Sequence, residues 1–137
     1  MKKVLLDTNL FIDWMNTRSR DDLIVGPGYA RYLSGIVLME LRAGARTRPA
    51  SRALDSLFRA YRDAGRLVLP GAAIFDGAGR ALQKLRRLGA VDVRGAAIVH
   101  DVLIALSARS IGATVLTRDA DFAIIRRAVP FDWARVT

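Results

Sequence analysis

The sequence contains no cysteine, one histidine and one glutamate among its 137 residues. Without cysteine there are no disulfide bonds and no thiolate metal sites, which is consistent with a cytoplasmic protein. The single histidine, His100, argues against a typical zinc site and is expected to be a packing or rim residue of a helix. No segment approaches the ~18 consecutive apolar residues of a membrane-spanning helix, so we expect no membrane association.

Motifs of several common enzyme classes are also missing. There is no GxxxxGK[ST] phosphate-binding loop, no GxGxxG motif after a strand and no GxSxG nucleophile elbow. A Ser–His–Asp triad would have to use His100 from the middle of an apolar segment, with no nucleophile motif to support it. A phospho-acceptor role for Asp7 is disfavoured, because that chemistry usually brings a late-strand lysine, whereas the only lysines are Lys2, Lys3 and Lys84.

The charge is strongly unbalanced. There are 22 Lys and Arg residues against 13 Asp and Glu, which gives a formal net charge of +9. Such an excess on a small domain favours a polyanionic partner such as nucleic acid, although arginine-rich chains also arise from coding bias. Every acidic residue except Glu40 is an aspartate. Because glutamate is normally a common surface residue of helices, the one that remains is expected to have a specific role.

The length and the hydrophobic content of 52% predict one domain over residues 1–137. Apolar runs predict strands at 4–6, 32–37, 66–69 and 114–116, with an edge strand at 129–133. Helical patterns cover 10–15, 38–45, 49–64, 74–88, 96–111 and 119–127, and 17–28 is predicted to be a loop. This alternation predicts an α/β domain with a mainly parallel central sheet flanked by helices.

Four acidic residues lie at the ends of predicted core strands or inside predicted helices. Asp7 ends the first strand, Glu40 follows the second, Asp101 lies inside the apolar helix and Asp119 follows the 114–116 strand. Functional groups of parallel sheets gather beyond the carboxyl ends of the strands, where Asp7 and Asp119 lie. Converging carboxylates repel one another unless a cation neutralises them, and oxygen ligands suit Mg²⁺ or Mn²⁺. Such ions polarise a phosphate and activate water.

Each acid also has a structural explanation. Asp7 and Asp119 occupy positions where turns and helix caps are common. For Glu40 the alternative is a surface ion pair within its helix, but no basic residue follows it at the matching spacing. For Asp101 the alternative is a salt bridge to an arginine such as Arg94 or Arg109, since an isolated buried carboxylate is costly.

Taken together, the motifs resemble those of the PIN-domain ribonucleases, and specifically the VapC-type toxins of toxin–antitoxin pairs. The resemblance rests on LLDTNLFID at Asp7, IVLMELRAGA at Glu40, HDVLIALSAR at Asp101 and VLTRDADF at Asp119, and it covers essentially the whole chain. It implies that Asp7, Glu40 and Asp101 are the three core metal-binding acids and that Asp119 occupies a more variable fourth position.

The resemblance also implies a PIN-like fold and a set of supporting residues. Asp121 matches a further acid, and three polar residues, Thr8, Asn9 and Thr117, match positions that orient the cluster. It implies dependence on Mg²⁺ or Mn²⁺, RNA as the substrate, homodimerisation and inhibition by a small cognate antitoxin. Residues 17–28 look shorter or less helical than the segment that grips the antitoxin in that family.

The resulting hypothesis is a metal-dependent endoribonuclease that acts as a toxin. Asp7, Asp101 and Asp119 are assigned as metal ligands, and Glu40 as a ligand or a base that orients water. The arginines expected to hold the RNA backbone are Arg42, Arg46 and Arg118. Two alternatives remain: a housekeeping PIN-domain nuclease that processes RNA without an antitoxin, and a basic RNA-binding module whose acids are only caps and salt bridges.

Overall fold

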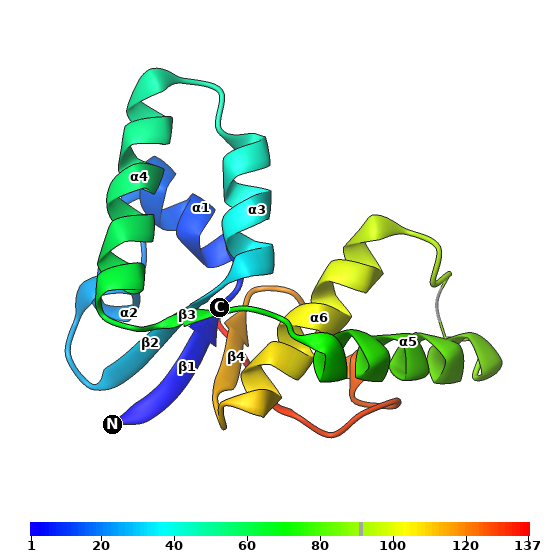
Figure 1. The fold of residues 1–137 in the computed structure, drawn as a ribbon. Helices are drawn as coiled ribbons and strands as arrows, with labels where there is room; N and C mark the ends of the chain where they lie inside the picture. Colours follow the sequence, from blue (N-terminus) through cyan, green and yellow to red (C-terminus); the bar gives the residue numbers. More distant parts are fainter. Residues whose placement is uncertain (91) are drawn as a thin grey trace.

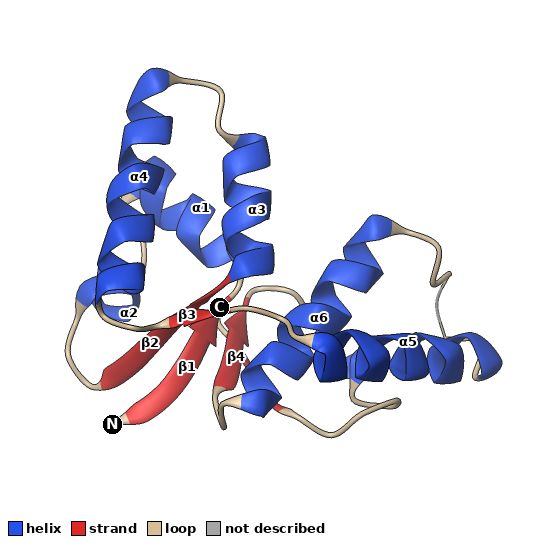
Figure 2. Cartoon of the chain, in the orientation of Figure 1, coloured by secondary structure: helices blue, strands red, loops and turns tan. Residues whose placement is uncertain are grey.

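The fold is built around a five-stranded sheet (Figures 1 and 2). The structure is a computed structural model that describes residues 1–90 and 92–137. The strands are β1 (Lys2–Leu6), β2 (Tyr29–Ser34), β3 (Leu67–Val68), β4 (Thr114–Thr117) and β5 (Asp132–Arg135), in the order β3-β2-β1-β4-β5. All neighbouring strands run parallel. The predicted α/β architecture with a parallel central sheet is therefore confirmed.

Helices connect the strands and cover the sheet. They are α1 (Thr8–Thr17), α2 (Asp21–Val25), α3 (Gly35–Gly44), α4 (Arg48–Asp63), α5 (Ala72–Arg87), α6 (Ala96–Ser110) and α7 (Phe122–Ile125). In Figure 1, α3 and α4 stand side by side as one hairpin, and α5 and α6 form a second packed pair. No helix in the described part of the chain is long and apolar enough to cross a membrane.

The core lies on both faces of the middle strand. β1 is a central strand, paired with β2 on one side and β4 on the other. Val4, Leu5 and Leu6 are completely buried, so both of its faces are covered. A strand covered on both faces needs a continuous apolar sequence, which is why this segment was recognisable. From α6, Val102 and Ile104 are completely buried as well. Burial of one such side chain contributes about 1.5–3 kcal/mol to folding before the loss of conformational entropy is subtracted. β1 and α6 therefore hold the residues at their ends in fixed positions.

Several element boundaries differ from the sequence predictions, and the strand predicted at 32–37 spans Tyr29–Ser34. The second strand ends at Ser34 instead of residue 37, because the Ser34 hydroxyl accepts a hydrogen bond from the Ile36 N–H at 3.0 Å and caps α3. The segment 17–28 was predicted to be a loop but contains the short helix α2, whose first turn carries Asp21 and Asp22 at the end of the helix dipole that favours acids. The predicted helix 119–127 is reduced to α7, and the last strand begins at Asp132.

Candidate active site

Asp7 lies at the carboxyl end of β1 and is only 5% exposed. Its backbone N–H donates to the Leu116 carbonyl, which extends the pairing of β1 with β4. Its carboxylate caps α1 by accepting the Thr8 N–H at 2.8 Å, and it accepts the Thr117 hydroxyl at 2.7 Å and the Asn9 amide at 3.3 Å. Burial raises the pKa of Asp7, the hydrogen bonds from Thr117 and Thr8 oppose that rise, and the charges of neighbouring acids add to it.

Glu40 reaches the same region from α3. Its Oε1 accepts the Thr8 hydroxyl at 2.9 Å, and its Oε2 lies 3.4 Å from Nδ1 of His100 on α6. Thr8 thus touches two acids, since its N–H binds Asp7 and its hydroxyl binds Glu40. The expectation that His100 only packs or lines a rim is incomplete, because its ring contacts a candidate catalytic carboxylate. Its position next to Asp101 was the signal that could have identified it.

Asp101 is a half-buried acid on α6 whose pKa is raised to about 7. Burial is the largest cause, followed by the negative charges of Asp7, Asp119, Glu40 and Asp121. Within residues 1–90 and 92–137 no salt bridge reaches its carboxylate. The structural alternative predicted a partner such as Arg94, but the Arg94 guanidinium pairs with Asp92. Asp101 therefore lies in the field of the other acids without a neutralising cation.

Thr117 connects Asp7 to the loop that carries Asp119. It is completely buried at the end of β4, donates its hydroxyl proton to Asp7 and accepts the Asp119 N–H at 2.9 Å. The Asp119 carboxylate in turn accepts the Asp121 N–H at 2.8 Å, which forms a tight turn before α7. Asp121 stands at the N-terminal boundary of α7, but its side chain caps no N–H there. The predicted supporting residues Thr8, Asn9 and Thr117 thus all contact the acidic cluster.

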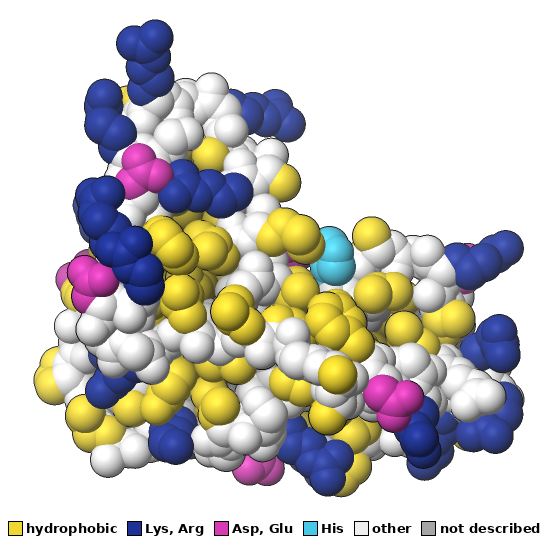
Figure 3. Space-filling view, in the orientation of Figure 1, with side chains coloured by type: hydrophobic (Ala, Val, Ile, Leu, Met, Phe, Trp, Pro, Cys, Tyr) yellow, Lys and Arg dark blue, Asp and Glu magenta, His cyan; other side chains and the backbone are white. Residues whose placement is uncertain are grey.

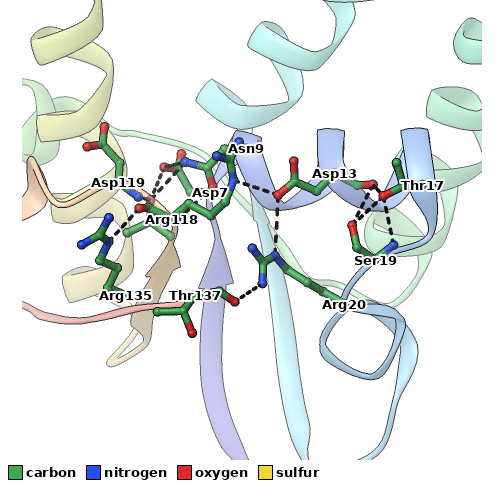
Figure 4. A network of polar contacts seen from close by, with 11 residues as sticks. Asp7, Asn9, Asp13, Thr17, Ser19, Arg20, Arg118, Asp119, Arg135 and Thr137 are labelled. Atoms are coloured by element: carbon green, nitrogen blue, oxygen red, sulfur yellow. Dashed lines mark hydrogen bonds and ion pairs between the residues drawn. The ribbon is translucent and has the colours of Figure 1, made fainter.

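Arg118, one of the three predicted RNA-binding arginines, is anchored within the protein (Figure 4). Its Nε donates to the Asp13 carboxylate of α1 at 2.8 Å. Its N–H donates to Asn9 at 3.2 Å, and its carbonyl accepts Nε of Arg135 from β5 at 3.0 Å. Asp13 also lies 3.6 Å from Nε of Arg20. The residue before Asp119 is therefore held between α1 and β5.

The other two arginines differ in their surroundings. Arg42 pairs with Asp55 of α4 at 2.7 Å, so it bridges the α3–α4 hairpin. Arg46 is exposed in the turn between α3 and α4, and it lines a cleft of about 310 Å³ together with Glu40. Arg118 also lines a hollow with a candidate acid, Asp119, but its guanidinium is paired with Asp13. Of the three, Arg46 is the one without an ion pair within the described residues.

Comparison with models of known protein families gives a match. Residues 4–128 match the model of the PIN domain. The chain belongs to the PIN domain family. The resemblance noted from the four acidic motifs is thereby confirmed, and no curated protein matches this PIN domain by sequence.

Solved structures agree with the family in fold. VapBC2 of Rickettsia felis, bound to a DNA fragment from its promoter, has 21% identity and a TM-score of 0.71, and the match covers 98% of this chain and 99% of that one. VapBC-5 of Mycobacterium tuberculosis, a member of the VapBC family of toxin–antitoxin systems, has 24% identity and a TM-score of 0.68 over 99% and 100%. DNA-bound VapBC of Salmonella typhimurium has 25% identity and a TM-score of 0.66 over 98% of each chain.

The donor set of this PIN domain fits a hard divalent cation. Asp7, Glu40, Asp101 and Asp119 offer only carboxylate oxygens, which Mg²⁺ and Mn²⁺ prefer. In the part of the chain that the structure describes, no three acidic or histidine side chains are close enough to hold one ion. Mg²⁺ commonly uses one or two carboxylates and retains several waters, so a complete protein cage is not required. Burial is the largest cause of the raised pKa of Asp101, but the charges of Asp7, Asp119 and Glu40 also contribute to it, and it is this negative field that would favour a bound cation.

Proposed function

We propose that this PIN domain protein is a metal-dependent endoribonuclease that acts as the toxin of a toxin–antitoxin pair. The observation that carries the proposal is Asp101, a half-buried acid surrounded by the negative charges of Asp7, Glu40 and Asp119 with no cationic partner in the described residues. Such an arrangement destabilises the protein unless a cation binds, so it is better explained by function than by stability. The net charge of +9 supports RNA as the polyanionic substrate.

Each residue has a proposed role in hydrolysis of the phosphodiester bond. Asp7, Asp101 and Asp119 would hold Mg²⁺ or Mn²⁺, and Glu40 would act as a ligand or as the base that orients the attacking water. Thr8, Asn9 and Thr117 hold the carboxylates by the hydrogen bonds described above, and Asp121 adds a further negative charge. When bound, the ion would neutralise charge on the phosphate and lower the pKa of water.

The RNA backbone would be held by arginines, with Arg46 in the best position. Arg46 lines the cleft that also contains Glu40, so a phosphate bound to it would lie on the approach to the acids. Arg42 and Arg118 would contact RNA only after leaving Asp55 and Asp13, respectively. Because the two ion pairs are partly exposed, each contributes little to stability and an RNA phosphate could compete for the guanidinium.

A small cognate antitoxin is the proposed protein partner, and a homodimer in the cytoplasm is the proposed assembly. The support is that VapBC complexes match nearly the full length of the chain. A cleft of about 620 Å³ between α1 and α4, lined by Trp14, Met15 and Leu57 among others, offers apolar surface that a partner could cover. A basic side chain of the partner would then be able to reach toward the acids.

The test is cleavage of RNA by the purified protein in EDTA, Mg²⁺ and Mn²⁺. Cleavage is expected only with a divalent ion, and Asp7→Asn should abolish it while leaving RNA binding near the wild-type level. Asp76→Asn is the matched control, because Asp76 is an exposed acid that pairs with Arg80 on α5. RNA binding without any metal-dependent cleavage would favour the basic RNA-binding module.

The toxin role needs a separate test. Expression of the chain alone should arrest growth, and co-expression with the product of a small neighbouring reading frame should restore it. Asp7→Asn expressed at the same level should be harmless. An active nuclease that is harmless when expressed alone would favour the housekeeping RNA-processing alternative.

A further inference from the structure

The Glu40 carboxylate is held from both sides. Its Oε1 accepts the Thr8 hydroxyl at 2.9 Å, and its Oε2 lies 3.4 Å from Nδ1 of His100. Thr8 directly follows Asp7, and His100 directly precedes Asp101. The two contacts therefore connect Glu40 to α1, which Asp7 caps, and to α6, which contains Asp101.

His100 is a half-buried residue in the body of α6 and takes no part in capping the helix. It is the fifth residue of α6, and its side chain is 27% exposed. Figure 3 shows the histidine at the surface, between the α3–α4 pair and the α5–α6 pair of helices. Its other ring nitrogen has no hydrogen-bond partner within the described residues. The contact with Glu40 is thus the one directed interaction that the structure gives this side chain.

We propose that His100 is a positioning residue that fixes the Glu40 carboxylate relative to Asp101. A glutamate has three side-chain torsions, and one donor on one oxygen leaves the carboxylate free to rotate. A second donor on the other oxygen removes that freedom and orients the carboxylate for the ion and for water, as outer partners of metal sites do. The role requires a proton on Nδ1, because the Glu40 oxygen can only accept, and a carboxylate beside Nδ1 favours the form of the ring that carries the proton there. This inference rests on the proposed metal-dependent nuclease.

The test compares His100→Ala with His100→Asn, because the side-chain amide of Asn places a donor near the position of Nδ1. Mn²⁺ affinity is measured by calorimetry, the cleavage rate in single turnover and folding by thermal unfolding. His100→Ala should weaken Mn²⁺ binding and slow cleavage, each roughly 10-fold or more. His100→Asn should recover most of both losses. Arg109→Ala, an exposed change at the far end of α6, serves as the control for general effects on the helix.

Removal of Glu40 separates positioning from a general structural effect. In a Glu40→Ala background, His100→Ala should cause no further loss of Mn²⁺ affinity, since there is no carboxylate left to orient. The proposal is overturned if His100→Ala binds Mn²⁺ and cleaves as the wild type does, if Asn is no better than Ala, or if the two losses add. Absence of Mn²⁺ binding and of metal-dependent cleavage in the wild type would contradict the proposed function itself, and this inference with it.

Discussion

Replacing Asp101 with Asn should stabilise the metal-free protein. The substitution keeps the shape of the side chain but removes one negative charge from a site where no salt bridge of the described residues balances it. Burial and the charges of Asp7, Asp119, Glu40 and Asp121 raise the Asp101 pKa from 3.8 to about 7. One pKa unit corresponds to about 1.4 kcal/mol, so a shift of about three units costs at most about 4 kcal/mol at neutral pH.

The pH window of this cost follows from proton counting. Between pH 3.8 and about 7 the folded protein keeps a proton on Asp101 that the unfolded chain has released. Folding stability from this group therefore falls as the pH rises through that window, and below it the penalty disappears because both states are protonated. Because the side chain is only half-buried, solvent screening reduces the effect, and we expect a gain of about 2–3 kcal/mol for Asp101→Asn at pH 7.

Thermal unfolding in EDTA and in excess Mg²⁺ measures both parts of the argument. In EDTA at pH 7 the variant should melt on the order of 10 °C above the wild type, and the difference should shrink toward pH 4. Mg²⁺ at 100 times its dissociation constant should stabilise the wild type by about 2.7 kcal/mol and the variant much less. Asp76→Asn should change little in either condition. A variant less stable than the wild type in EDTA, with no Mg²⁺ effect on either protein, would refute the metal-site reasoning.

Three further predictions test individual assignments. Asp119→Asn should reduce cleavage less than Asp7→Asn, because an amide oxygen can still bind a divalent ion. The single-turnover rate at saturating Mg²⁺ measures this, and equal losses would contradict the ranking. Arg46→Ala should weaken binding of inactive protein to RNA similarly for all sequences and lower the slope of log affinity against log salt by about one. Arg118→Ala should lower the free energy of unfolding by less than about 1 kcal/mol, because the pair that it loses with Asp13 is partly exposed. If it also lowers RNA affinity as much as Arg46→Ala does, Arg118 leaves this pair to bind RNA.

The order of strands and helices was predictable because most elements carry a clear periodic signal. β1, β4 and α6 each contain a buried apolar run, at residues 4–6, 115–116 and 102–105 respectively. The boundary between β2 and α3 was not predictable in the same way. Ile36 and Val37 have high β propensity, but Ser34 caps a helix that begins at Gly35.

The members of the acidic cluster were predictable, but several of its contacts were not. Asp7 and Asp119 follow neighbouring parallel strands, so the rule on carboxyl ends of strands already brings them together. The ion pair of Arg118 with Asp13 could not be predicted from the net charge of the chain. Its side chain meets Asp13, which is distant in sequence and becomes close only because α1 lies beside the β4–α7 loop. Charge predicts the type of partner but does not distinguish an RNA phosphate from an aspartate of the same chain.

The one glutamate occupies the position where an aspartate would be too short. Asp7 and the loop of Asp119 come directly after strands of the sheet, so short side chains suffice there. Glu40 is the sixth residue of α3, well past the end of β2, and its carboxylate must reach Thr8 on α1 and His100 on α6. A side chain with one methylene fewer at this position would withdraw the carboxylate from both donors. The geometry of α3 thus explains why a glutamate stands at this position, because this carboxylate has to reach from one helix to two others.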